Sequence, residues 1–327
     1  MALHPEVAAT LVCPRDRTRL SGTSDQLVCE QGHRFPVCGG IPVLVLDDGP
    51  GIHVSVARAL DEAERTEDLG LDDGETPPPT TLHPFVRELQ GATSGAMFHA
   101  ARDRFTTYPI PELRLPDGAG ERLLDIGCAW GRWSIAAARK GYRVTGIDHN
   151  FSRLVIARRV CRQLGVEADF VCADARRLPF ADGGFDVAFS YSVVQHFSKD
   201  QARLILAEVG RVLAAGGTGM IQMPNRYGIR SLYHQLRKTW TPARPYDVRY
   251  WTARELLRDF EAAIGPSRLT IDGFFGLGIQ ARDSERFLPH HRAIVRLSER
   301  LRRAPWLAPV ADSLYVHSTA RSPRSTT

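Results

Sequence analysis

Long apolar runs are absent from this sequence. The longest aliphatic stretches, such as "IPVLVL" (41–46), are too short to cross a bilayer as a helix, so we expect no transmembrane segment. A secretory signal has a cationic segment followed by an apolar one, and the first residues of this sequence contain no such pattern. We therefore expect a cytoplasmic protein.

Cysteine is also scarce. Six cysteines in 327 residues, without a secretion signal, predict reduced thiols or metal ligands rather than a disulfide framework. Cys128, Cys161 and Cys172 fall in predicted strands or helices, where we expect them to be buried as small apolar residues. The sequence has no internal repeat, and its length allows more than one domain.

A G-x-G-x-x-G fingerprint is missing as well. In "LLDIGCAWGRW" (123–133), Gly127 and Gly131 are four residues apart and Ala129 lies between them. A dinucleotide fold needs its glycines so that a pyrophosphate can approach the backbone N–H groups at the start of a helix. Asp125 would repel a phosphate but attract an ammonium group. The loop therefore indicates a cationic amino-acid nucleoside as cofactor.

Strands and helices alternate after this loop. We predict helices at 131–140, 151–164, 200–214 and 252–265, and strands at 122–128, 143–149, 168–174, 185–192, 218–224, 268–275 and 312–319. Alternation of this kind predicts parallel β-α-β units and hence an α/β fold with a doubly wound, seven-stranded sheet.

Two further acids follow the second and third predicted strands. Asp148, next to His149, is placed to accept hydrogen bonds from both ribose hydroxyls, because ligands of doubly wound sheets bind at the carboxyl ends of the strands. Asp174 can accept from an adenine amine while the backbone at Ala175 covers the ring. We add Ser190, at the end of the fourth strand, to the cofactor-binding set. The alternative is that the acids are ordinary residues at strand ends.

The motifs resemble those of a known family. "LLDIGCAWGRWS", "VTGIDHN", "CADARRLPFADGGFDVAFS", "VVQHFS" and "LAEVGRVLAAGG" resemble, in order and spacing, the motifs of class I S-adenosylmethionine-dependent methyltransferases, and most of all their quinone and small-molecule branch. The resemblance covers residues 121–225 strongly and 226–320 weakly. It implies S-adenosylmethionine as cofactor and a Rossmann-like, seven-stranded sheet whose last strand is antiparallel.

The segment after the fourth strand reads "SYSVVQHFS" (190–198). It lacks the Asn/Asp-Pro-Pro-aromatic loop of enzymes that methylate base amines, and it lacks the cysteine that carbon-5 methylation of pyrimidines needs. Tyr191 and His196 remain as candidate catalytic residues, since a histidine can deprotonate a hydroxyl near neutral pH. Alternatively, His196 opens the next helix or bonds to backbone, without a catalytic role.

The first 46 residues predict a small zinc-ribbon-like module. Its "CPRD" and "CEQGH" resemble half of the zinc ribbon of bacterial ribosomal-RNA guanine methyltransferases, with Asp16 at the place of a cysteine. The module also resembles small zinc-ribbon proteins that activate tRNA and protein methyltransferases. Cys13, Asp16, Cys29 and His33 form a workable set of zinc ligands. The alternative is a module without metal, which depends on a core of Leu11, Val28, Phe35, Ile41 and Val43.

Charge and composition divide the rest of the chain. Residues 47–83 are acidic and rich in proline, which predicts a linker. Residues 84–320 are the predicted methyltransferase domain, with substrate-lid segments near 226–250 and 277–310, and 321–327 form a disordered tail. From Arg226 onward there are 18 Lys and Arg against 9 Asp and Glu. This surplus fits RNA, an acidic substrate, a membrane surface, or simply a solvated arginine-rich face.

Three functions agree with these features. The first is a methyltransferase that acts on a small metabolite or on a glycan or lipid precursor. The second is a methyltransferase of ribosomal or transfer RNA that holds its substrate with the ribbon and the basic half of the chain. The third is a non-catalytic, cofactor-binding scaffold. The sequence does not determine the acceptor or the oligomeric state.

Overall fold

The computed structural model describes residues 3–46, 56–68, 82–93, 103, 105–238, 247–275, 280 and 289–322. The strands are β1 (Leu20–Gly22), β2 (Gln26–Cys29), β3 (Arg34–Cys38), β4 (Ile41–Leu44), β5 (Arg122–Ile126), β6 (Arg143–Asp148), β7 (Asp169–Ala173), β8 (Phe185–Ser190), β9 (Leu213–Pro224), β10 (Ser267–Gly273) and β11 (Ser313–Thr319). The helices are α1 (Pro5–Thr10), α2 (Val56–Asp68), α3 (Pro84–Thr93), α5 (Arg132–Ala138), α6 (Phe151–Gln163), α7 (Lys199–Val212), α8 (Ile229–Lys238), α9 (Ala253–Ala263) and α10 (Pro289–Leu301), with 3-10 turns η2 (Val194–His196) and η4 (Pro305–Val310).

The sheet corrects one prediction and confirms the general fold. It has eleven strands, in the order β1-β2-β3-β4-β7-β6-β5-β8-β9-β11-β10, rather than seven. The seven strands β5 to β11 are the predicted ones and lie next to one another. β5 to β9 are parallel in their pairings, and β11 is antiparallel to both β9 and β10. The general α/β fold and the antiparallel last strand therefore agree with the sequence.

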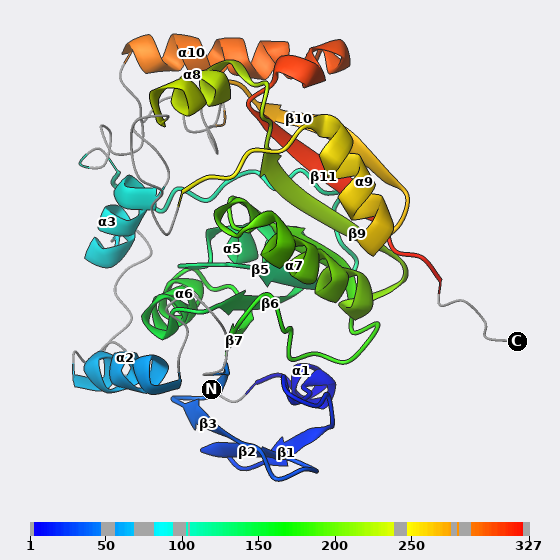
Figure 1. The fold of residues 1–327 in the computed structure, drawn as a ribbon. Coiled ribbons are helices and arrows are strands. Elements are labelled where there is room, and N and C mark those ends of the chain that lie inside the picture. Colours follow the sequence, from blue (N-terminus) through cyan, green and yellow to red (C-terminus); the bar gives the residue numbers. More distant parts are fainter. Residues whose placement is uncertain are drawn as a thin grey trace, which may run out of the picture.

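The four additional strands come from the amino-terminal module, which extends the sheet at the edge strand β7 (Figure 1). β4 pairs parallel with β7, with Val43 opposite Cys172 and Leu44 opposite Ala173. All four residues of β4 are buried. Leu11 and Phe35 of the module belong to the same apolar core as Val171 and Phe180 of the predicted methyltransferase domain. The module is thus continuous with the larger sheet in both hydrogen bonding and packing.

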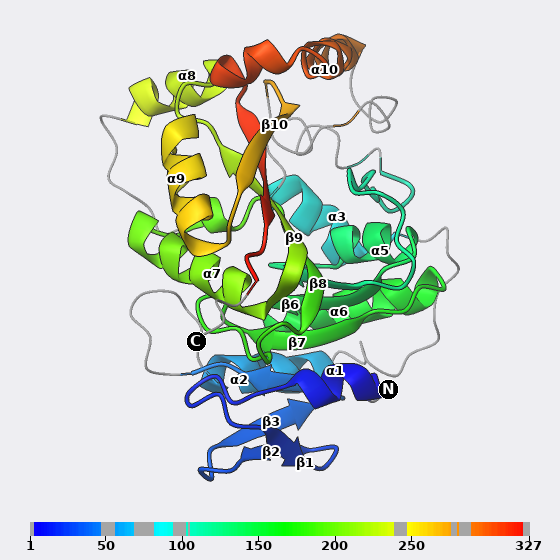
Figure 2. The ribbon, with the colours of Figure 1, turned by 90° about the vertical axis from the view of Figure 1, so that its right-hand side faces the viewer.

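Helices cover both faces of the sheet, with α3, α5 and α6 on one side and α7 and α9 on the other (Figure 2). Alternate residues of the strands supply the two cores. In β5, Leu123 belongs to the core beneath α5 and α6, and Leu124 belongs to the core beneath α7 and α9. Burial of both faces explains why the central strands are apolar throughout.

The predicted linker contains a helix. Within residues 47–83, α2 packs against α6, and only the flanking stretches 47–55 and 69–81 lie outside the described residues. Glu62 of α2 accepts hydrogen bonds from the Asn150 side chain and from the backbone N–H of Phe151, at 2.9 and 2.8 Å. A carboxylate is favourable there because the start of a helix has unpaired N–H groups and a partial positive charge.

The two predicted lid segments contain helices in their described parts. α8 lies within 226–250, and α10 and η4 lie within 277–310. Residues 239–246, 277–279, 281–288 and, in the predicted tail, 323–327 lie outside the described residues. In the part of the chain that is described, no helix is long and apolar enough to span a membrane.

Candidate cofactor and acceptor site

The loop after β5 has the backbone shape of a ligand-binding turn. Gly127, Ala129 and Gly131 all have positive φ angles, of 75°, 49° and 82°. A Cβ on Gly127 would lie 2.3 Å from Cγ2 of Val193, which comes from the segment after β8. Glycine is therefore required at 127 by both backbone and contact, whereas Ala129 adopts a conformation that costs an alanine roughly 1–2 kcal/mol.

Asp148 holds this loop from the end of β6. Its carboxylate accepts hydrogen bonds from the backbone N–H of Ala129 at 3.1 Å and of Asn150 at 2.9 Å. His149 Nδ1 lies 3.4 Å from the same carboxylate. The predicted ribose-binding acid is thus adjacent to the predicted loop, and it is buried in the site.

Asp125 is buried below the loop, where Ser134 Oγ donates a hydrogen bond of 2.6 Å to it. Burial raises the pKa of the Asp125 carboxyl to about 7, and the nearby charge of Asp148 acts in the same direction, although the Ser134 hydrogen bond opposes them. A cationic group at this position would stabilise the ionised carboxylate.

Asp174 is engaged by an arginine. Its two oxygens accept from Arg176 Nε at 3.1 and 3.0 Å and from Arg176 Nη2 at 2.7 Å. The backbone N–H of Arg176 is a further donor, and the neighbouring Ala175 is buried. A contact between Asp174 and an adenine amine therefore requires rearrangement of Arg176. Ser190 is also occupied, since its hydroxyl donates to the carbonyl of Ile126 at 2.9 Å.

The two candidate catalytic residues occupy different surroundings after β8. Tyr191 is buried against Trp133, with ring centroids 4.7 Å apart, and its hydroxyl donates to Asp272 Oδ2 at 2.8 Å. Burial, and then the charge of Asp272, holds the pKa of Tyr191 well above its ordinary value, so this phenol keeps its proton at neutral pH. His196 is half-buried in η2, where its Nε2 lies 3.4 Å from the amide nitrogen of Gln195.

Sequence reasoning missed Asp272 and its partners. Asp272 also accepts from Ser313 Oγ at 2.7 Å and from Arg114 Nη1 at 2.9 Å. β10 runs parallel to β9, because both are antiparallel to β11, so Asp272 is another acid near the carboxyl end of a strand. The same criterion, an acid at the carboxyl end of a strand, that identified Asp125, Asp148 and Asp174 would also have identified Asp272. Nothing in the sequence indicates Arg114, which lies 158 positions away.

Two buried polar atoms beside this network have no hydrogen-bond partner among the described residues. They are Trp133 Nε1 and the Tyr315 hydroxyl. Both rings contact Tyr191, at centroid distances of 4.7 and 6.0 Å. Buried polar groups are normally bonded, so two such groups around one tyrosine indicate a place where a ligand's polar atoms bind.

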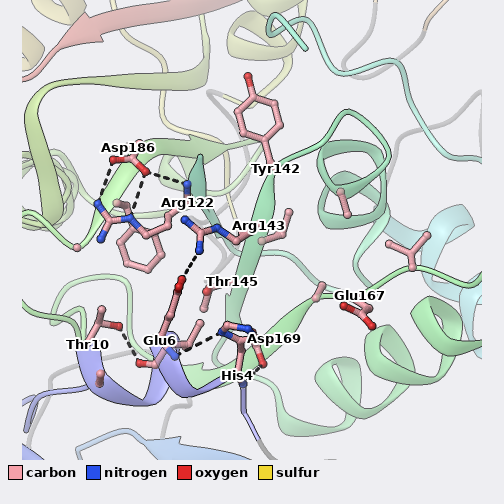
Figure 3. A pocket seen from close by; sticks show the side chains of 18 of the residues that line it. His4, Glu6, Thr10, Arg122, Tyr142, Arg143, Thr145, Glu167, Asp169 and Asp186 are labelled. Carbon is pink, nitrogen blue, oxygen red and sulfur yellow. Dashed lines mark hydrogen bonds and ion pairs between the residues drawn. The ribbon is translucent and has the colours of Figure 1, made fainter. Parts of the chain in front are cut away.

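A separate cavity of about 910 Å³ lies at the opposite edge of the sheet, where α1 packs against the amino ends of the strands (Figure 3). Its charged side chains pair across it, Arg122 with Asp186 and Arg143 with Glu6. The predicted cofactor acids lie at the carboxyl ends of the strands, so this cavity is distinct from the predicted cofactor site.

The four predicted metal ligands lie together in the module. Their ligand atoms are all within 4.8 Å of one another. Cys29 Sγ lies 3.3 Å from His33 Nδ1 and 3.4 Å from Asp16 Oδ2, and Cys13 Sγ lies 3.6 Å from His33 Nδ1. The prediction that Cys128, Cys161 and Cys172 are buried is confirmed.

Comparison with known proteins agrees with this geometry. A family described as "Methyltransferase domain" matches residues 123–217. Methyltransferase GfsG of Streptomyces halstedii is 37% identical over 108 residues, which are 32% of this chain and 38% of that protein. A ubiquinone biosynthesis O-methyltransferase of Ruegeria pomeroyi is 31% identical over 160 residues, which are 48% of this chain and 64% of that protein. The chain thus spans less than two thirds of either relative.

Among solved structures, the YcgJ protein of Bacillus subtilis is similar, with 21% identity and a TM-score of 0.44, over 63% of this chain and 94% of that one. The family match covers β5 to the first part of β9, which includes the glycine loop and all three strand-end acids. Residues 123–217 therefore match a methyltransferase domain, in agreement with the resemblance that the sequence motifs indicate.

Proposed function

We propose that the protein transfers a methyl group from S-adenosylmethionine to a hydroxyl group of a small molecule. The observation that carries the proposal is the placement of Asp125 and Asp148 around the glycine loop, together with the polar cluster of Tyr191 and Asp272 after β8 and β10. The relatives include proteins named as O-methyltransferases, which supports oxygen as the accepting atom.

In this proposal the cofactor binds across the carboxyl ends of β5, β6 and β7. Asp148 accepts from the ribose hydroxyls beside His149, and the backbone at Gly127, Ala129, Gly131 and Ala175 approaches the nucleoside. Asp125 would face the ammonium group of the methionine part, and that positive charge would favour the ionised carboxylate. Asp174 takes the adenine amine after Arg176 moves, and Ser190 positions the strand end rather than the ligand.

The transfer itself requires little from the protein beyond orientation. The acceptor oxygen forms a bond to the methyl carbon while the carbon–sulfur bond breaks, and the hydroxyl proton leaves to a base. We assign the proton to His196. Tyr191 stays protonated and orients the acceptor, since its pKa is too high for a base. Trp133 Nε1 and the Tyr315 hydroxyl are available to bind acceptor oxygens.

The test is methyl transfer from labelled S-adenosylmethionine. The purified protein is incubated with fractionated pools of small metabolites, lipids and RNA, and each fraction is examined for label. Label in a small-molecule or lipid fraction supports the proposal. Label in RNA alone would instead support the nucleic-acid alternative, and binding of the cofactor without transfer to any pool would support a scaffold.

We also propose that the module binds one structural zinc ion. Four ligands at Zn–S and Zn–N/O distances of about 2.0–2.3 Å lie roughly 3.3–3.8 Å apart in a tetrahedron. The distances from Cys13 to His33 and from Cys29 to His33 and Asp16 fit this requirement. Asp16 Oδ2 and His33 Nδ1 are hydrogen-bonded at 2.8 Å, so zinc binding requires these two atoms to separate by roughly half an ångström. Asp16 Oδ1 accepts from the N–H and the hydroxyl of Thr18, at 2.9 and 2.6 Å, which leaves Oδ2 directed at His33 Nδ1 and the Cys29 thiol. Such outer contacts orient a ligand carboxylate.

A further inference from the structure

The exposed apolar side chains of this protein are concentrated in one region. Among the described residues, ten large hydrophobic side chains are exposed, and nine of them lie between residues 227 and 310; the tenth is Leu204 on α7. The nine are Tyr227, Ile229, Leu232, Tyr233, Leu236, Ile294, Leu297, Trp306 and Val310. Leu236 and Trp306 are the most exposed, at 72% and 77%. A concentration of this kind marks an interaction surface rather than scattered surface residues.

The apolar face of α8 points outward, whereas the helices of a globular protein normally turn their apolar face towards the core. Ile229, Leu232, Tyr233 and Leu236 follow the i, i+3, i+4, i+7 spacing of one helix face, and that face is exposed. The residues on the inner side are polar: Ser231 is buried, and His234 and Gln235 are half-buried. Because the hydrophobic effect normally turns such a face inward, we infer that another apolar medium covers it.

The elements that carry these residues are fixed to one another. α8, η4 and α10 lie at the same end of the molecule in both views (Figures 1 and 2). The side chain of Asn225, before α8, donates to the carbonyls of Pro309 and Ala311 at 2.9 Å each. Asp312 Oδ1 accepts from the N–H of Arg230 and Ser231 at the start of α8. These bonds join α8 to η4, and α10 leads into η4 through a tight turn in which the N–H of Ala304 donates to the carbonyl of Leu301. We call the region the α8/η4/α10 surface.

The charge around this surface selects the partner. Exposed arginines border the apolar residues at Arg226, Arg237, Arg296, Arg300 and Arg303. α8 and η4 contain no acidic residue, and the only one in α10, Glu299, is half-buried and pairs with Arg114 and Arg302. A second copy of the chain would place these arginines against one another, since a two-fold interface brings the same patch together. The partner must be anionic and apolar.

RNA fits less well than a lipid surface. Bases stack on aromatic rings, but six of the nine exposed residues are aliphatic and offer nothing to a base. Aliphatic side chains with a tryptophan, bordered by arginines, are the composition of helices that lie in a bilayer interface. We propose that the α8/η4/α10 surface docks the protein on an anionic membrane, with α8 and α10 parallel to it. This proposal does not depend on the methyl acceptor.

The position of the surface relates it to the site. α8 follows the carboxyl end of β9, and η4 precedes the start of β11, which pairs with that end through Ser313 and Pro224. Asp272 and Tyr191 lie at the same edge of the sheet. Docking would thus bring the acceptor side of the site close to the membrane, where an apolar acceptor accumulates.

The proposal is tested by flotation of the full-length protein with lipid vesicles, which measures the bound fraction. No cofactor or acceptor is added. One set of vesicles is phosphatidylcholine, and the other contains about one third phosphatidylglycerol. We expect binding to the anionic vesicles that weakens as salt is raised. Leu236→Ser with Trp306→Ser should lower the bound fraction at least about tenfold, because both side chains lose their burial in lipid. Arg296→Glu with Arg300→Glu should lower binding to the anionic vesicles only.

Leu204→Ser is the matched control, because Leu204 is an exposed leucine on another face. It should float like the unmodified protein. The proposal is overturned if the unmodified protein binds neither kind of vesicle, or if Leu204→Ser reduces binding as much as the double variant does. It is also overturned if the double variant converts a dimer into a monomer, or abolishes RNA binding, while vesicle binding is unchanged.

Discussion

The Tyr191 hydroxyl donates a 2.8 Å hydrogen bond to the carboxylate of Asp272, and this bond joins the end of β8 to the end of β10. The two residues are 81 positions apart, and both are buried. Through Ser313 and Arg114 the same carboxylate also holds the start of β11 and the segment before β5. One acid thus fixes the geometry of the proposed acceptor side of the site.

The first prediction concerns this bond. Tyr191→Phe should lower the free energy of unfolding by about 1–3 kcal/mol, because a buried carboxylate oxygen loses a donor. Tyr315→Phe is the matched control: its hydroxyl has no partner among the described residues, so its removal should cost little stability. Chemical denaturation measures both. If Tyr315→Phe costs as much as Tyr191→Phe, the hydroxyl of Tyr191 contributes nothing specific. Under the proposed function, Tyr315→Phe should still raise the KM for the acceptor.

The second prediction concerns the close contact in the cofactor loop. Gly127→Ala should destabilise the protein by about 2–4 kcal/mol, because the new Cβ collides with Val193 and because alanine is strained at a φ of 75°. Val193→Ala in the same chain should relieve the two closest contacts, leaving the Val193 Cβ at 3.1 Å and about 1–2 kcal/mol of backbone strain. Thermal or chemical unfolding of the two variants separates the effects. Failure of Val193→Ala to recover stability would contradict the contact.

The sequence predicted most of the parallel sheet because the pattern there is local. Predicted strand 143–149 became β6 (Arg143–Asp148), and predicted helix 151–164 became α6 (Phe151–Gln163). The boundary between α7 and β9 was less accurate. The predicted helix 200–214 extends two residues too far and the predicted strand 218–224 begins five residues too late, because α7 ends at Val212 and β9 begins at Leu213. The ladders with β8 and β11 resume only at Thr218, and the backbone of Gly216 and Gly217 bonds instead to Ala320, just after β11.

The features that could not be predicted from the sequence depend on contacts between residues that are far apart in the chain. The four buried residues of β4 look like a central strand, but no local pattern shows that their neighbour is β7, about 130 positions later. Arg114 reaches Asp272 across 158 positions, and Glu62 reaches the start of α6 from a segment that composition marks as linker. Composition describes a segment's average tendency, whereas these contacts depend on single side chains.

The third prediction concerns the pH dependence of stability. Burial raises the pKa of Asp125 from 3.8 to about 7, so its contribution to stability is complete below its unfolded pKa and is lost as pH rises through about 7. Asp125→Asn should therefore gain stability relative to the unmodified protein, by about 2–3 kcal/mol between roughly pH 5 and pH 7, with no further change above that. Unfolding curves at several pH values measure this gain.

Asp186 provides the control for Asp125. Its hydrogen bonds with Arg122 lower the pKa of the Asp186 carboxyl, so its contribution is present above its ordinary pKa of 3.8 and is lost only as pH falls below it. Asp186→Asn should therefore change stability by the same amount at pH 5 and at pH 8. A flat difference for Asp125→Asn as well would show that Asp125 titrates normally.

The fourth prediction concerns the cofactor and the base. Asp148→Ala should weaken S-adenosylmethionine binding by roughly 1.5–3 kcal/mol, the range for hydrogen bonds to a charged group.

His196→Ala should lower kcat about 10²–10⁴-fold while the cofactor affinity is unchanged. Calorimetry and steady-state kinetics distinguish the two effects. Near-full turnover without His196 would show that the enzyme works by positioning alone.

The last prediction concerns the metal. The purified protein should contain close to one zinc ion per chain, and Cys29→Ser should lose it, because only three ligands remain. Asp16→Cys should tighten binding, since a thiolate is the softer ligand. Removal of zinc by a chelator should destabilise β7 as well as the amino-terminal module, because β4 of the module pairs with β7 and the two share one apolar core. Hydrogen exchange should therefore increase at Val171 and Cys172 as well as in β2 and β3. A metal-free protein whose β2 and β3 are fully protected would show that apolar packing alone holds the module.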